Sequence, residues 1–268
     1  MFGKLMKHEW RSTAPTQGIL ALAAFGAAVL AGIMLRLLFG AEEQLPDALT
    51  ASLAASMGFM LLAMVGCVAA MSILLLVRFY KHKFTDEGYL TFTLPVNSHQ
   101  IFLSSALNML IWTAIATAVV LLGFFTFLQI GLSGELPFDP EDLNMISQEL
   151  DDLGFKDAMG LQVLISLPYS VVMTMTCITV GAVIAKKHKI LAAFGIYYGI
   201  SYLSGIFSSI LSAVLTGSIM NTPFDSVEAE IAAMSNMITT ASVLWEVALM
   251  IGGYLLSTHL MKKKLNLP

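Results

Sequence analysis

Charged residues are scarce in this chain of 268 residues: they make up 12% of it, whereas soluble domains contain roughly 25%. Hydrophobic residues account for 57%, and the mean hydropathy is +0.80. So few charges do not cover the water-facing surface of a globular protein of this size. The composition therefore excludes an ordinary cytosolic enzyme and a disordered tail. It predicts a polytopic membrane protein that forms one domain, residues 1–268.

Cysteine and the common catalytic motifs are also scarce. Cys67 and Cys177 are too few and too far apart for a disulfide framework or a zinc site. The sequence contains neither the G-x-x-x-x-G-K-[ST] loop that binds ATP nor the H-E-x-x-H motif of metalloproteases. The net charge of −4 gives no reason to expect a nucleic-acid partner. We therefore expect a chain that is not an enzyme and that binds no metal or other cofactor itself.

Long hydrophobic runs dominate what is present. Each of six runs reaches the length of about 20 residues that a helix needs to cross a bilayer. The runs lack the period-two alternation of barrel strands, so they predict an all-α fold with six transmembrane helices. The runs lie near Gly18–Phe39, Ser52–Val77, Ile101–Leu132, Leu161–Ala185, Ile190–Thr216 and Ile238–Leu260.

Basic residues repeat at every second connection between these runs. Of the 14 Lys and Arg residues, all but Arg36 and Lys156 fall in the N-terminal segment, in two connections and in the C-terminal segment. Six crossings place these four segments on one side of the membrane. Since Lys and Arg concentrate on the cytosolic side, both termini are predicted to be cytosolic, in a multi-pass protein of the plasma membrane.

The N-terminal segment, residues 1–17, has the pattern of an interfacial helix. Phe2, Leu5, Met6 and Trp10 recur at helical spacing, while basic residues occupy the other faces. A basic helix with a tryptophan on its apolar side suits the inner surface of a membrane. The alternative is a frayed tail.

Two acidic segments, 134–160 and 217–237, fall on the predicted outer side. Each contains an apolar stripe at helical spacing, which in the second consists of Val227, Ile231 and Met234. We predict two extracytoplasmic amphipathic segments. They either cover an exit path or pack on the surface of neighbouring spans.

The connection after the second run, residues 78–100, is the most informative part of the chain, and we call it the inner segment. Within it, Thr85–Leu94 mixes charges with aromatic residues. Together with Phe84, the aromatic residues Tyr89 and Phe92 are expected to be exposed. Aromatic rings beside charges are typical of a protein interface. The alternative is that the rings fold back onto the membrane surface.

Glu246 is the one carboxylate inside a predicted span. An acid in that environment is by default a candidate functional residue, which binds a cationic part of a substrate or carries a proton. With Trp245 and Tyr198 it forms the predicted substrate path. The alternative is a structural polar group that is hydrogen-bonded to another span, for example at Gln129 or Asn108, or that is reached by water.

The fourth and fifth runs contain candidate packing and hinge residues. Gly195 and Gly199 form a G-x-x-x-G motif that Gly205 follows, and small residues at this spacing let helices approach closely, either within the chain or across a dimer seam. Pro168 interrupts the backbone hydrogen bonding of the fourth run and is a candidate hinge.

The layout of the chain resembles that of a known family. Six spans, an N-terminal interfacial helix and the inner sequence DEGYLTFTLP at residues 86–95 resemble the permease subunits of bacterial ABC exporters of the type-2 class, which have the type V fold. The inner sequence is similar to that of Gram-positive peptide and drug efflux permeases. The resemblance implies a non-catalytic subunit that exports amphipathic peptides, drugs or lipids.

The resemblance also implies the partners and the coupling residues. Two permease chains, identical or paralogous, would pair in the lipid membrane with two separate ATPase subunits, which bind ATP and Mg²⁺. Residues 217–237 would match an outer re-entrant region. A second hypothesis is a proton-coupled secondary transporter that uses Glu246. The residues that would dock on the ATPase are Phe84, Asp86, Glu87, Tyr89, Leu90 and Phe92.

Overall fold

The computed structural model describes residues 2–40, 46–85, 88, 97–132, 155–185, 188–219 and 227–263. In this part of the chain all regular secondary structure is helical. Six helices are long and apolar enough to cross a membrane, which confirms the prediction of an all-α protein with six membrane-crossing segments. The helices are α1 (Phe2–Gly40), α2 (Asp47–Phe84), α4 (Ser98–Gly131), α6 (Phe155–Ile184), α7 (Lys189–Ile219) and α8 (Val227–Lys263).

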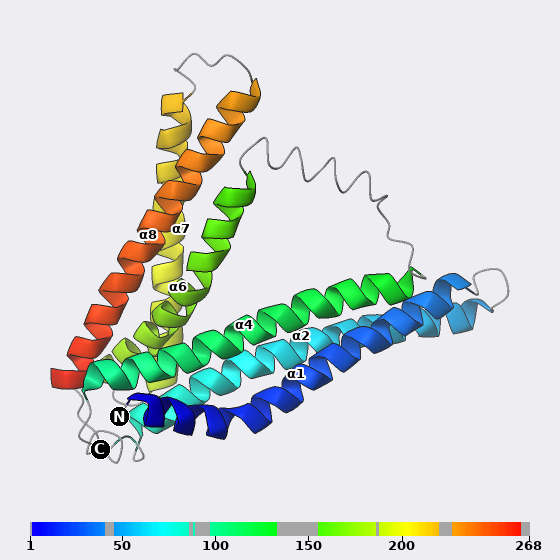
Figure 1. Ribbon diagram of the computed structural model, residues 1–268, viewed down its shortest axis with the longest axis horizontal. Coiled ribbons are helices and arrows are strands. Elements are labelled where there is room, and N and C mark those ends of the chain that lie inside the picture. The colour runs from blue at the N-terminus through cyan, green and yellow to red at the C-terminus, as the bar shows by residue number, and fades with distance from the viewer. Residues whose placement is uncertain are drawn as a thin grey trace. The chain divides into compact units, whose positions relative to one another are not determined.

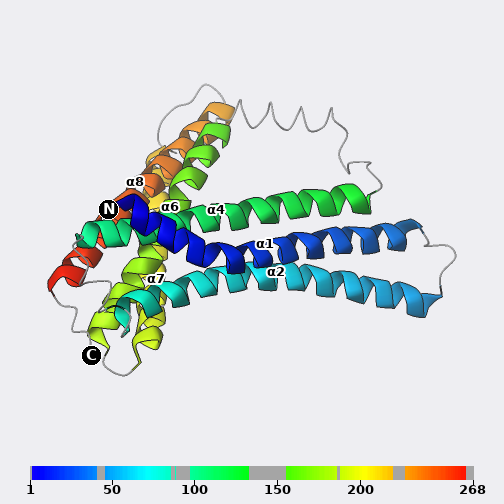
Figure 2. The ribbon, with the colours of Figure 1, turned by 60° about the horizontal axis from the view of Figure 1, so that its bottom comes forward.

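The N-terminal segment is not a separate helix. Residues 2–17 are the first turns of α1, which continues without a break through 39 residues. Its first, dark blue turns run at an angle to the rest of the helix (Figures 1 and 2). Pro15 lies inside the helix and explains a bend, because proline donates no backbone hydrogen bond and its ring crowds the carbonyl one turn earlier. The placement of these turns at a membrane surface stays a prediction.

The acidic outer segments also differ from the prediction where the structure describes them. Residues 227–237 are the first turns of α8 rather than a separate amphipathic segment. Residues 155–160 likewise open α6. Residues 217–219 are the last residues of α7. Residues 134–154 and 220–226 lie outside the described residues.

The described chain divides into two compact units, and the assignment of residues 1–268 to one permease domain stays a prediction. The N-terminal unit comprises Met1–Arg78 and Leu107–Asp139, and the C-terminal unit comprises Phe79–Ala106 and Pro140–Pro268. The N-terminal unit therefore contains α1 with most of α2 and α4. The C-terminal unit contains α6, α7 and α8 together with the last turns of α2 and the first turns of α4.

In the N-terminal unit, α1 lies beside α2 and α4 (Figures 1 and 2). Small residues allow this approach: Ala24 and Ala28 of α1 are fully buried, and Ala28 packs with Met64 of α2 in the core. A Cβ atom added at Gly32 of α1 would lie 3.0 Å from the carbonyl oxygen of Phe127 in α4. This spacing of small residues every four positions is the pattern that lets membrane helices pack closely.

In the C-terminal unit, α6 packs against both α7 and α8. Hydrogen bonds between α6 and α8 join residues 84, 80 and 81 positions apart along the chain. This nearly constant offset means that α6 and α8 run parallel. The helix between them in sequence, α7, runs antiparallel to both, as expected for three consecutive membrane crossings.

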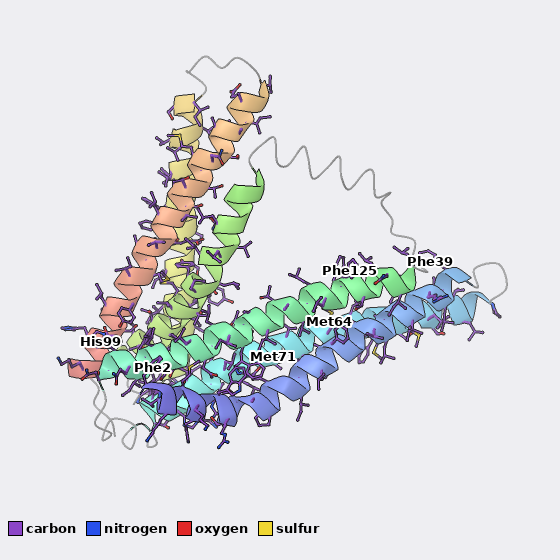
Figure 3. The ribbon with its side chains drawn as sticks, in the orientation of Figure 1. Phe2, Phe39, Met64, Met71, His99 and Phe125 are labelled. Carbon is purple, nitrogen blue, oxygen red and sulfur yellow. The ribbon has the colours of Figure 1, made fainter. Side chains whose placement is uncertain are left out.

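The outer faces of the helices are apolar. Figure 3 labels Met64 and Met71, which are buried between helices of the N-terminal unit, and Phe39 and Phe125, which are exposed. Exposed large hydrophobic residues occur on all six helices. An exposed apolar surface of this extent suits contact with lipid, because a water-soluble monomer rarely exposes so much.

Candidate functional site

Helix α8 carries Ser242, Trp245 and Glu246 at positions i, i+3 and i+4, so the three side chains share one face of the helix. This face meets α6 and α7. Glu246 lies near the middle of α8, more than about 20 Å from either end at 1.5 Å per residue. The polar side chains around it form what we call the Glu246 cluster: Gln162 and Tyr169 of α6, Ser204 of α7, and Ser242, Trp245 and Glu246 of α8.

The carboxyl group of Glu246 is bound on one oxygen only. Gln162 donates a hydrogen bond from Nε2 to Glu246 Oε1 at 2.8 Å. The amide is held in turn by Ser242, whose hydroxyl lies 3.1 Å from Gln162 Oε1 and 2.8 Å from the carbonyl of Thr239. Since the amide oxygen faces Ser242, the amide nitrogen faces the carboxyl group.

The second oxygen, Glu246 Oε2, is buried and has no hydrogen-bond partner among the described residues. No ion pair reaches Glu246 in the same part of the chain. Burial of a polar atom without a partner costs free energy, and burial of an unpaired charge costs more. The site therefore favours a group that offers a hydrogen-bond donor and a positive charge to this oxygen.

Trp245 joins the cluster to α7. Its indole nitrogen donates to Ser204 Oγ at 2.9 Å, and the phenol of Tyr169 lies near both Ser204 and Glu246. The indole ring stacks on Phe207, with ring centroids 4.1 Å apart and an interplanar angle of 29°. The cluster thus combines polar groups from all three helices with a pair of stacked aromatic rings.

Tyr198 does not belong to this arrangement, contrary to the predicted substrate path. It is 67% exposed, and its ring contacts Tyr197 of the same helix at 5.9 Å. Ser204 and Phe207, which do reach α8, lie on another face of α7, because six and nine residues correspond to rotations of about 240° and about 180° from Tyr198. Of the three predicted residues, Glu246 and Trp245 lie in the cluster and Tyr198 does not.

The hydrogen-bond partner of Glu246 in the structure belongs to another span, α6, and it is a residue that the sequence did not single out. Gln162 occupies the carboxyl group, whereas Asn108 Oδ1 accepts from the hydroxyl of Thr13 at 3.3 Å, and Gln129 is exposed. Gln162 stands at the edge of its apolar run, so its position alone did not mark it as an interior residue. The sequence did offer one indication: Gln162 is a polar residue inside a predicted span, and such a residue needs a hydrogen-bond partner.

The inner segment is described only in part. Phe84 was expected to be exposed, but it is 4% exposed. Its ring packs on Phe79 at 5.7 Å and on Tyr80 at 6.3 Å. It therefore anchors the last turn of α2 rather than presenting a ring to solvent. The other predicted docking residues lie outside the described residues: Asp86, Glu87, Tyr89, Leu90 and Phe92.

The glycine motif of α7 has no close neighbour. A Cβ atom added at Gly195, Gly199 or Gly205 would meet no atom within 4 Å. Of the two alternatives, close packing within the chain therefore has no support in the described ranges, and the dimer seam stays a prediction. Pro168 lies inside α6, and its role as a hinge also stays a prediction.

A second polar cluster lies in the N-terminal unit, and it was not predicted. Thr13, Gln17, Asn108 and Trp112 are all buried. Trp112 Nε1 donates to Thr13 Oγ1 at 3.1 Å, and Gln17 Nε2 donates to the carbonyl of Met71 at 3.1 Å. Unlike the Glu246 cluster it contains no charged group. We interpret it as a set of contacts that fix the register of α1 against α2 and α4.

The described part of the chain contains no group of three or more His, Cys, Asp or Glu residues that could hold a metal ion. No family model matches the chain, and searches of curated proteins and of solved structures give no match either.

Proposed function

We propose that this chain is the permease subunit of an ATP-driven ABC exporter, with both termini in the cytosol and the helices in the plasma membrane. The observation that carries the proposal is the combination of six membrane-length apolar helices with an aromatic and charged inner segment between the second and third of them. The chain has no G-x-x-x-x-G-K-[ST] loop of its own, so in an ATP-driven exporter the hydrolysis of ATP would take place on a partner. The partners would be ABC ATPase subunits and a second permease chain.

The two ends of the inner segment are suited to transmit a force. On the side of α2, the buried ring of Phe84 packs on Phe79 and Tyr80 and stiffens the last turn. On the side of α4, His99 Nδ1 lies 2.9 Å from the hydroxyl of Tyr254 in α8, and Phe102 packs edge-on against the same ring at 5.6 Å.

Tyr254 lies two turns beyond Glu246 on α8. A pull on the inner segment would therefore act on the helix that carries the Glu246 cluster. In this mechanism, closure of the ATPase subunits on ATP moves the inner segment, and α8 moves with the start of α4. The helices then alternate between arrangements open to the inside and to the outside, and the cargo follows the path between them.

Alanine at Tyr89 or Phe92 is expected to abolish association with the ATPase, because docking interfaces depend on a few buried aromatic side chains. The measurement is co-purification of the tagged permease with its ATPase from membranes of the native host. We expect at least a tenfold loss of bound ATPase for each variant.

The matched control for this experiment is Phe125→Ala. Phe125 is an exposed aromatic residue on α4, away from the inner segment in sequence, and its loss should leave ATPase binding unchanged. If Tyr89→Ala and Phe92→Ala bind the ATPase as the control does, the docking assignment is wrong.

The second candidate function is a proton-coupled secondary transporter. It is favoured by one observation, the buried and unpaired oxygen of Glu246. Proteoliposomes that contain this chain alone separate the two functions. Accumulation of cargo driven by a proton gradient would support the secondary transporter, and its absence together with ATP-driven transport by the complex would support the permease.

A further inference from the structure

The Glu246 cluster presents one unsatisfied acceptor inside a helical unit that has an apolar exterior. Oε1 accepts from Gln162, whereas Oε2 is buried without a partner in the described ranges. A charge-assisted hydrogen bond from a cationic donor would satisfy the oxygen and neutralise the charge at once. No Lys, Arg or His side chain within the described part of the chain forms such a pair with Glu246, so this oxygen is open to a donor from a ligand.

The surrounding oxygens argue against an inorganic cation. Calcium takes six to eight oxygen ligands, and magnesium takes six in a near-ideal octahedron. Here the amide oxygen of Gln162 already faces the hydroxyl of Ser242, and Ser204 Oγ already accepts from Trp245. One free carboxylate oxygen suits a single N–H donor instead, such as that of an ammonium group.

The neighbouring rings suit an apolar body attached to that ammonium. Trp245 precedes Glu246 in sequence and stacks on Phe207 of α7. Phe207 is exposed, so the ring pair extends from the cluster to the surface of the unit. An amphiphile could place its charged end at Glu246 and its apolar portion along these rings.

We propose that Glu246 binds the ammonium group of an amphipathic cation, with the Trp245–Phe207 pair as the contact for its apolar portion. This inference rests on the proposed function, since it names the cargo class of the exporter as singly charged amphipathic amines. Glu246 as a whole is half-buried. Rotation of the Glu246 side chain therefore brings its carboxyl group to an approaching ligand, and the C-terminal unit stays folded.

The test measures binding to this chain alone in lipid nanodiscs, without an ATPase. The probe is dansylcadaverine, whose primary ammonium is joined through a short alkyl chain to a fluorophore that accepts energy from tryptophan. Its N-acetylated form has nearly the same apolar body and no charge. Energy transfer from protein tryptophan to each probe gives the dissociation constant, because Trp245 lies beside the proposed site.

Three results are expected. Wild type binds the ammonium probe at least tenfold more tightly than Glu246→Gln, which preserves size and polarity but removes the charge. Glu246→Asp, which retains the charge, recovers most of the lost affinity. Wild type binds the acetylated probe no more tightly than Glu246→Gln binds the ammonium probe. Equal affinity of wild type and Glu246→Gln, or of the two probes for wild type, would overturn the proposal, as would an aspartate variant as weak as the glutamine variant.

A competition experiment keeps the test decisive if a variant does not fold. Excess octylammonium should release the ammonium probe from wild type, whereas the same concentration of octanol should not. Release by both compounds to the same extent would show that the probe binds by apolar contact alone and would overturn the proposal.

The outcomes also distinguish the two proposals. If the probe binds through Glu246 while the chain never associates with an ATPase, the exporter function fails and the ammonium site stands. If the ATPase associates through the inner segment but probe binding does not depend on Glu246, the ammonium site fails and the exporter function stands.

Discussion

Valine in place of Gly181 is expected to disrupt the packing of α6 against α7 and to lower the melting temperature of the protein strongly. A Cβ atom at this position would lie 2.7 Å from the backbone nitrogen of Ala193 and 2.8 Å from its Cα. These neighbours are backbone atoms near the start of α7, so no flexible side chain can move aside. Overpacking of this kind costs about 1–3 kcal/mol, and the further methyl groups of valine would raise the cost above that of alanine.

The matched control for Gly181 is Gly252 of α8. Both are helical glycines of the C-terminal unit, but a Cβ atom added at Gly252 meets nothing within 4 Å. Alanine is favoured over glycine within a helix by about 1 kcal/mol. Gly252→Ala should therefore leave the melting temperature of the purified protein in detergent unchanged or raise it, whereas Gly181→Ala should lower it and Gly181→Val should lower it further. Equal melting temperatures for the two alanine variants would show that the contact between Gly181 and Ala193 does not constrain the fold.

The existence and number of the helices were predictable because a bilayer imposes a length and a composition on each crossing. Runs of about 20 apolar residues have few alternatives in lipid. The extents were less predictable. α8 (Val227–Lys263) begins eleven residues before the predicted run at Ile238, because an α-helix, once nucleated, continues cheaply through polar residues that tolerate helical geometry. For the same reason the segment before Pro15 joins α1.

The structure shows close helix packing within the chain at residues that the sequence analysis did not name. Gly195 and Gly199 of α7 match the expected spacing and meet no neighbour. Ala24 and Ala28 of α1 show the same spacing, and they are fully buried. The spacing alone does not distinguish these two stretches. Small residues allow a second helix to pack closely, but they do not determine whether a second helix lies beside them. Only the tertiary arrangement selects the pair that is used.

The charged residue of the candidate site, Glu246, was predicted from the sequence, but its hydrogen-bond partner was not. Glu246 was identifiable because a carboxylate inside an apolar run is rare and expensive. Its partner Gln162 lies 84 residues away, and no local pattern links the two. The link follows from the parallel packing of α6 and α8, which sets residues about 80 positions apart side by side, and this offset depends on the lengths of the intervening helix and connections.

The second large effect is expected for Thr13→Val. Valine has nearly the shape of threonine but lacks the hydroxyl that accepts from Trp112 Nε1 at 3.1 Å and lies 3.3 Å from Asn108 Oδ1. Trp112 and Asn108 are buried, so their polar atoms would lose a partner away from water, at a cost of about 1–3 kcal/mol for each unsatisfied group. Hydrogen bonds between membrane helices contribute less, about 0.6 kcal/mol each on average. The loss of the two contacts is therefore expected to lower the stability by about 1–2 kcal/mol, less than the sum of the two burial costs.

Thr16→Val is the matched control, because Thr16 is exposed on the same helix and its hydroxyl donates only to the carbonyl of Thr13, at 3.0 Å. The measurement is the melting temperature of both variants, together with their tryptophan emission, since Trp10 stacks on Trp112 with ring centroids 4.9 Å apart. Thr13→Val should lower the melting temperature and alter the emission, and Thr16→Val should do neither. Equal behaviour of the two variants would mean that the buried hydroxyl does not hold α1 against α4, and that the small residues further along α1 suffice to fix the register of these helices.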